Sequence, residues 1–185
     1  MLWRIHTHQL DLINFFAESE PTWVWAELEP GMEDYGTVYR GDGGRTASLE
    51  PGVNAHIGFA NGVRASFLGW KQIPQDVVVQ LLGTEALIEL DLEGWRMITV
   101  PSSDDRAPTP DLAKPSVVPI VPEFNVSGMS AALRELIGVM RSGGSTSSTG
   151  ETARRTMAIT DAILQSAAKG NIRVRVAPPP WAPKS

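Results

Sequence analysis

The chain has 185 residues, a formal net charge of −5 and no cysteine. The length suits one domain, and the absence of cysteine excludes disulfides and thiolate metal sites, as expected for a cytoplasmic protein. An acidic chain is a poor partner for nucleic acid, whose phosphates require Lys and Arg. No apolar run approaches the ~20 residues that span a bilayer. We therefore expect a cytoplasmic globular domain that binds neither nucleic acid nor membrane.

The first 50 residues predict a helix, a strand and a long loop. Residues 5–18 have helical spacing, with Leu12, Phe15 and Phe16 as a wide apolar stripe. Residues 22–29 alternate in the manner of a strand. Residues 30–50 hold five glycines and mixed charges, which is typical of a loop.

Residues 53–59 and 63–67 predict a β-hairpin around Ala60-Asn61-Gly62. A two-residue turn at Asn61-Gly62 places Arg64 and Ser66 on the face of Phe59. A three-residue loop with a left-handed Gly62 instead keeps that face apolar, and we favour this register.

Residues 76–82, 86–92 and 95–100 predict three more strands, and the short turns between them imply antiparallel neighbours. Residues 101–123 hold six prolines and predict an irregular excursion. Residues 130–141 predict a helix with an apolar face, formed by Leu133, Leu136, Ile137 and Met140.

A second helix then begins at a capping box, in which Ser148 and Glu151 satisfy orphan amides. It runs to about Lys169, with Gly170 as its C-terminal cap. Residues 172–176 form a last strand, and residues 177–185 a Pro-rich tail. The element order predicts an α+β fold over residues 1–176: an open, mostly antiparallel sheet with helices on one face and the other face available for oligomerisation.

Several segments in this order resemble one family. Residues 8–12 and 20–27 look like its opening helix and first strand, residues 59–62 like its central hairpin, and residues 81–90 like a characteristic strand turn. Residues 141–143 and 150–166 are similar to its paired terminal helices. The chain thus resembles the C-terminal domain of the Gfo/Idh/MocA oxidoreductases, the family of glucose–fructose oxidoreductase and inositol dehydrogenase.

The resemblance implies a sugar, polyol or related hydroxy compound as the small-molecule substrate, and NAD or NADP as the cofactor of a complete member. In this family an N-terminal Rossmann domain holds the nucleotide, and no such domain is found in these 185 residues. The Gly-rich run 41–44 lacks the strand, the helix and the glycine spacing of a dinucleotide loop. We therefore expect this chain alone to bind neither cofactor nor metal, and a separate Rossmann-domain subunit is a possible partner.

The family's second domain supplies an Asp-x-x-x-His pair. Aligning its histidine on His8 places Arg4 where the aspartate is usual. On a helix Arg4, His8 and Asp11 share a face, so we expect His8 to exchange a proton with a substrate hydroxyl, Asp11 to orient the imidazole, and Arg4 to bind an anionic substrate. The alternatives are that His8 packs beneath the sheet with Asp11 as its partner and that Arg4 is a solvated cation.

The aromatic candidates for a sugar pocket or an interface are Trp25, Tyr35, Trp70 and Trp95. The candidates for the open sheet face are His56, Gly58, Leu68 and Trp70, and such a face favours a homo-oligomer. Our leading hypothesis is a substrate-binding and oligomerisation domain of an oxidoreductase, inactive alone. The alternatives are a non-catalytic binding or scaffolding subunit and a truncated gene product.

Overall fold

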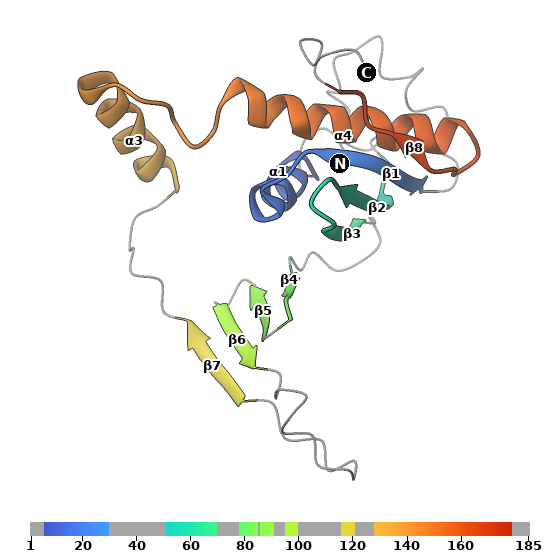
Figure 1. The fold of residues 1–185 in the computed structure, drawn as a ribbon, viewed down its shortest axis with the longest axis horizontal. Coiled ribbons are helices and arrows are strands. Elements are labelled where there is room, and N and C mark those ends of the chain that lie inside the picture. Colours follow the sequence, from blue (N-terminus) through green and yellow to red (C-terminus); the bar gives the residue numbers. More distant parts are fainter. Residues whose placement is uncertain are drawn as a thin grey trace. The chain divides into compact units, whose positions relative to one another are not determined.

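The computed structural model describes residues 6–29, 51–69, 78–84, 86–90, 95–99, 116–120 and 128–178. These residues form α-helices and two four-stranded antiparallel sheets (Figure 1), so the predicted α+β class is confirmed. The chain divides into two compact units, residues 1–73 with 143–185 and residues 74–142. Each unit is described by itself.

The first unit is built on a sheet with the strand order β3-β2-β1-β8. Its strands are β1 (Pro21–Leu28), β2 (Val53–Phe59), β3 (Arg64–Gly69) and the short β8 (Val174–Arg175). All neighbours are antiparallel. Strand β8 is shorter than the predicted 172–176, although Val176 N still donates to Thr22 O over 3.1 Å.

The hairpin between β2 and β3 has the predicted three-residue loop. Ala65 pairs with Ile57, Phe59 N donates to Val63 O over 3.0 Å, and Gly62 has a φ of +94°. A side chain strains this left-handed backbone, which glycine adopts freely. The register keeps Ile57 and Phe59 on one buried face, as the apolar pattern required.

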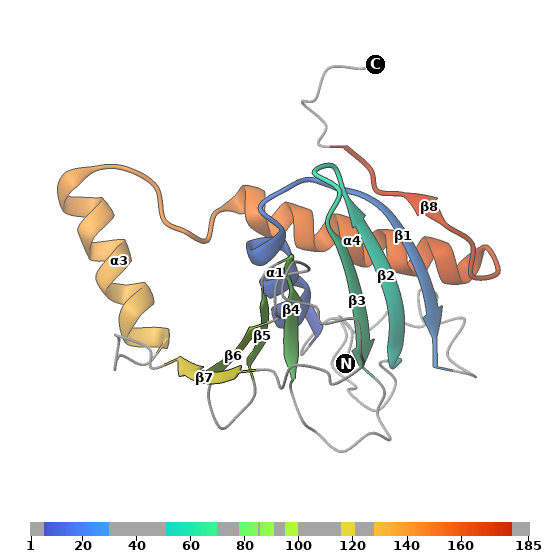
Figure 2. The same ribbon diagram turned by 60° about the horizontal axis from the view of Figure 1, so that its bottom comes forward.

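Helices α1 (His6–Ala17) and α4 (Gly150–Ala168) both pack on that buried face of the sheet (Figure 2). The core between them is aliphatic, and its fully buried side chains include Leu10, Val24, Ile57, Ile159 and Ile163. Burying one such side chain stabilises the fold by about 1.5–3 kcal/mol. The predicted arrangement of helices on one sheet face is therefore found in this unit.

The prediction that Leu12, Phe15 and Phe16 form the buried face of the first helix is wrong. The buried positions of α1 are His6, Leu10, Asn14 and Ala17, whereas Phe15 is 66% exposed. Spacings of four, four and three residues place these four on one helix face. Two polar residues thus occupy core positions, and the larger aromatic ring does not.

The N-cap of helix α4 lies one residue later in the chain than predicted. The N-cap is Thr149, whose side chain accepts from Thr152 N, and Thr152 Oγ1 in turn accepts from Thr149 N. The predicted capping box of Ser148 and Glu151 is wrong because Thr149, equally able to cap, stands next in the chain. At the other end Gly170 has a φ of +81°, as predicted for the C-terminal cap.

The second unit contains a sheet with the order β4-β5-β6-β7. Strands β4 (Val79–Leu82), β5 (Ala86–Leu90) and β6 (Trp95–Thr99) confirm three predictions. Strand β7 (Ser116–Ile120) lies within the segment predicted to be irregular and pairs antiparallel with β6. Proline usually interrupts a strand, but β7 is an edge strand, where proline is tolerated. A single sheet was predicted, whereas the described strands form two.

Helix α3 (Gly128–Ser142) of this unit confirms the predicted helix. The side chains of its predicted apolar face are all exposed: Leu133, Leu136, Ile137 and Met140. Among the described helices, none is long and apolar enough to cross a membrane.

Candidate functional site

The predicted site residues lie on α1. His8 is exposed, because the helix turns its neighbours His6 and Leu10 inward. Asp11 is half-buried at the edge of the contact with α4. Arg4 lies outside the described residues. The helix therefore presents His8 to solvent, where a small molecule can reach it.

Among the described residues, the side chain of Asp11 is hydrogen-bonded to α4 and not to His8. Thr156 Oγ1 donates to Asp11 Oδ1 over 3.0 Å, and Asn14 Nδ2 donates to Thr156 Oγ1 over 3.1 Å. Asn14 and Thr156 are both 5% exposed, so the hydrogen bond between them is shielded from water, whereas Asp11 is half-buried. It fixes the position of α1, and with it His8, against α4.

Sequence reasoning missed Thr156 as the partner of Asp11. The available signal was the pair Thr156 and Thr160, two hydroxyls four residues apart within the apolar stripe of a helix. Both are buried. Thr160 Oγ1 donates to Thr156 O within α4 over 3.0 Å, whereas Thr156 bonds to α1. Such a pair therefore marks a buried polar position without deciding which hydroxyl has its partner on the facing helix.

His6 is the histidine that packs against the sheet. It is 3% exposed, and its ring lies 5.0 Å from that of Phe67 in an edge-to-face arrangement. It also lies over Gly69, where an added Cβ would overlap the imidazole. The packing role that the sequence left open for His8 is thus filled by His6.

A cluster of four charged residues joins the start of β1 to the first turns of α4. Arg154 Nη2 lies 3.0 Å from Glu20 and 2.7 Å from Glu151, and Arg155 Nε lies 2.5 Å from Glu20. The hydrogen bond from Arg154, followed by the charges of both arginines, holds the pKa of Glu151 below its ordinary value. The carboxylate raises the pKa of Arg154 in return. These charges pair with one another, so the cluster serves to anchor α4.

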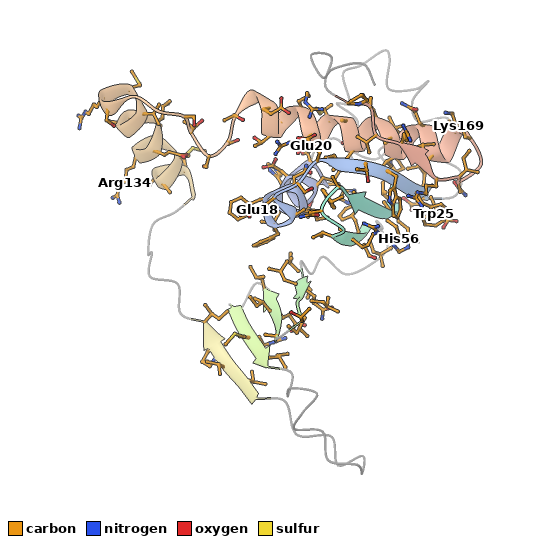
Figure 3. All side chains as sticks on the ribbon, in the orientation of Figure 1. Glu18, Glu20, Trp25, His56, Arg134 and Lys169 are labelled. Atoms are coloured by element: carbon orange, nitrogen blue, oxygen red, sulfur yellow. The ribbon has the colours of Figure 1, made fainter. Side chains whose placement is uncertain are left out.

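The sheet of the first unit has a second face, on the side away from α1 and α4. There Trp25 and His56 lie side by side (Figure 3), with ring centroids 5.4 Å apart. His56 Nδ1 is hydrogen-bonded to Ser66 Oγ at 3.0 Å. Trp23 lies against Gly58, whose Cβ position its indole ring occupies. The predicted placement of His56 and Leu68 on this face is found, with both exposed, and Trp70 lies outside the described residues.

A groove of about 210 Å³ lies between α4 and the segment after β8. It is lined by side chains of that helix and by the segment after β8, among them Met157, Asp161 and Pro178. Neither His8 nor Asp11 lines it. The groove and the predicted site are therefore different places on the first unit.

Two features of the described residues bear on nucleotide and metal binding. The Gly-rich segment before α4 has no strand leading into it, and Glu151 places a negative charge in the first helical turn, where a phosphate would bind. No cluster of three potential metal ligands occurs among the described residues. The run 41–44 lies outside them. What this part of the chain offers is an accessible imidazole and an aromatic sheet face.

Solved structures share this fold. A putative NADPH-dependent oxidoreductase from Desulfitobacterium hafniense matches 94% of the chain with a TM-score of 0.69 and 17% identity. An aldose–aldose oxidoreductase from Caulobacter crescentus, solved with glycerol, matches 91% with a TM-score of 0.65 and 17% identity. The WlbA dehydrogenase of Bordetella pertussis, solved with NADH and UDP-GlcNAcA, matches 95% with a TM-score of 0.58 and 12% identity.

The chain spans about half the length of each of these proteins, 47%, 45% and 45% respectively. No family model and no curated protein matches it. The resemblance to Gfo/Idh/MocA-type oxidoreductases is confirmed as a shared fold.

Proposed function

We propose that the chain is the substrate-binding and oligomerisation domain of a Gfo/Idh/MocA-type oxidoreductase of the cytoplasm. Its substrate is a sugar, polyol or related hydroxy compound, and polypeptide outside these residues supplies the NAD(P)-binding half. The observation that carries the proposal is the coverage: the fold match takes in 94% of this chain but 47% of an NADPH-dependent oxidoreductase.

His8 is the residue that we assign to chemistry. It is exposed on a helix whose position is fixed by the hydrogen bonds that join Asn14 and Asp11 to Thr156. A fixed, accessible imidazole can exchange a proton with a substrate hydroxyl near neutral pH. Asp11 acts as a positioning residue through α4, and Arg4 remains our candidate for an anionic group of the substrate.

The alternative function is a binding or scaffolding subunit without catalysis. It is favoured by the engagement of Asp11 with Thr156, which leaves no described carboxylate hydrogen-bonded to His8. In that case the aromatic sheet face, and not α1, is the functional surface of the first unit. We propose this face as the contact of a homo-oligomer in either case.

Saturation-transfer NMR with a panel of aldoses, polyols and nucleotide sugars separates the two functions. The enzyme proposal expects at least one class to bind, and His8→Ala to weaken that binding at least about tenfold. Phe15→Ala, an exposed change on the same helix, is the matched control and should bind normally. Equal binding by both variants would exclude His8 as a substrate contact. A panel without any binder would favour the scaffold.

A further inference from the structure

The groove beside α4 is built from one stripe of that helix and from the start of the Pro-rich tail. The helical residues that line it are Arg154, Met157, Ala158, Asp161, Ala162 and Gln165. Spacings of three and four residues place them on one face, along about three turns. The opposite side is formed by Ala177 and Pro178, the first two residues of the tail. The tail therefore already lies against this stripe where it begins.

The stripe is hollow and apolar at its centre. Ala162 is buried and Ala158 is partly buried, and both pack against the core of the first unit. Because alanine ends at Cβ, the helix surface is low between the longer side chains on either side of it. Met157 stands beside this hollow and is 40% exposed. A further apolar side chain placed here covers the methionine and fills the space above the alanines.

Strand β8 carries the chain back along α4 toward the start of that helix (Figure 2). Before the strand, Ser166 Oγ near the end of α4 donates to Ile172 O over 2.6 Å. After it, Val176 N donates to Thr22 O over 3.1 Å, and the residue just before β1 is ion-paired with Arg154 in the first turns of α4. The chain that leaves Val176 is thus directed along the groove.

The residues that follow Pro178 have the length and the composition to fill the groove. They read Pro-Pro-Trp-Ala-Pro-Lys-Ser and lie outside the described part of the chain. A Pro-rich sequence favours the polyproline II conformation, which rises about 3.1 Å per residue, so Trp181 comes about 9 Å beyond Pro178. The stripe on α4 is about 16 Å long. Trp181 therefore falls within the length of the groove.

Tryptophan is also the side chain of this segment that gains most from such a contact. An aromatic side chain can bury about 150–250 Å², and its ring makes favourable contacts with the sulfur of a methionine such as Met157. A buried indole N–H needs an acceptor, and Asp161 and Gln165 line the groove with side-chain oxygens. Both ends of the required contact are present on α4.

The cost of ordering this segment is small. Prolines on both sides of Trp181 already restrict the backbone in the free state. The tether from Pro178 is three residues long, and a short tether gives an effective concentration in the millimolar range. A contact that is weak between separate molecules is therefore sufficient within one chain.

We propose that residues 179–185 bind in the α4 groove of their own chain, with the Trp181 ring against Met157 and the indole N–H donating to Asp161. The segment then forms a strap over the exposed stripe of α4, the helix that holds α1 in position through Thr156. This inference goes beyond the proposed function and does not depend on it.

Methyl NMR of the full chain, labelled with ¹³C at the methionine methyl groups, tests the contact. The face of an indole ring shifts a methyl group above it upfield, so the Met157 resonance, assigned by its loss in Met157→Leu, should lie upfield of those of the exposed Met129 and Met140. Trp181→Ala should move it downfield to their position, and Trp181→Phe should keep part of the shift. Pro183→Ala, in the same segment, is the matched control and should leave it unchanged.

Three results would overturn the proposal. A Met157 resonance that is the same in wild type and Trp181→Ala would exclude the contact. An equal displacement by Pro183→Ala would show that Trp181 is not the anchor. An upfield shift that disappears on dilution would mean that the groove binds the segment of another copy and not its own. The amide resonances of the buried Ile57 and Ile163 show in each variant that the first unit is folded.

Discussion

Ser166→Ala should destabilise the first unit strongly, although it removes only one hydroxyl. Ser166 is completely buried on α4. Its Oγ accepts a hydrogen bond from Ala26 N over 2.8 Å and donates to Ile172 O over 2.6 Å. Ser166 thus stands where a further strand residue would pair with β1, beyond the short β8, and closes that edge of the sheet.

The cost follows from the two backbone groups that alanine leaves behind. The buried N–H of Ala26 loses its acceptor and the carbonyl of Ile172 loses its donor. A buried polar group without a partner costs about 1–3 kcal/mol, and the carbonyl is nearer the surface and recovers part of its loss from water. We therefore expect the free energy of unfolding of the first unit to fall by about 2–4 kcal/mol.

Urea unfolding of Ser166→Ala, with Ser145→Ala as an exposed control, measures this difference. Amide hydrogen exchange adds a local reading, since the exchange of Ala26 N–H should accelerate more than that of Val24 N–H on the same strand. A loss below about 0.5 kcal/mol with an unchanged denaturant slope would refute the reasoning. It would mean that Ser166 does not close the sheet edge.

Three further predictions concern local features. In urea titrations, Thr149→Ala should lower the free energy of unfolding by about 1 kcal/mol, whereas Ser148→Ala should change it by less than about 0.5 kcal/mol. A larger loss for Ser148→Ala than for Thr149→Ala would place the N-cap at Ser148. Gly58→Ala should displace the indole ring packed on it, seen as a changed near-ultraviolet circular dichroism spectrum; an unchanged spectrum would contradict this packing. The hydrogen bond from Arg154 lowers the pKa of Glu151. The stability that this ionised carboxylate contributes is therefore complete above its ordinary pKa of about 4.3 and is lost as pH falls through the lowered pKa. The thermal unfolding temperature of Glu151→Gln should consequently depend less on pH in this acid range than that of the wild type. If the unfolding temperatures of the wild type and Glu151→Gln fall equally with pH, the stabilising contribution of Glu151 is excluded.

The hairpin and the terminal helix could be predicted from the sequence because their signals are local. At residues 60–62 one register alone keeps the apolar residues together, and a glycine stands where the backbone becomes left-handed. At Gly170 the same left-handed conformation ends α4. A few adjacent residues decide such features, whatever the rest of the chain does.

The buried face of α1 could not be predicted because it is decided by contacts with distant residues. Phe15 is the larger apolar group, yet Asn14 is buried because Thr156, 142 residues later, supplies its hydrogen-bond partner. Thr156 also donates a hydrogen bond to Asp11, whereas the sequence pattern predicts His8 as the partner of Asp11. Strand β7 was missed for a similar reason, since only its pairing with β6 and its edge position explain a proline within it.

We propose that this chain provides the substrate and interface half of an oxidoreductase and that other polypeptide provides the nucleotide half. A fluorescence titration of the purified chain with NADPH tests it most directly, with NADH in parallel. We expect no saturable change in the emission of either nucleotide at concentrations up to about 1 mM, the upper end of ordinary KM values. Saturable, stoichiometric binding of either nucleotide would contradict the claim.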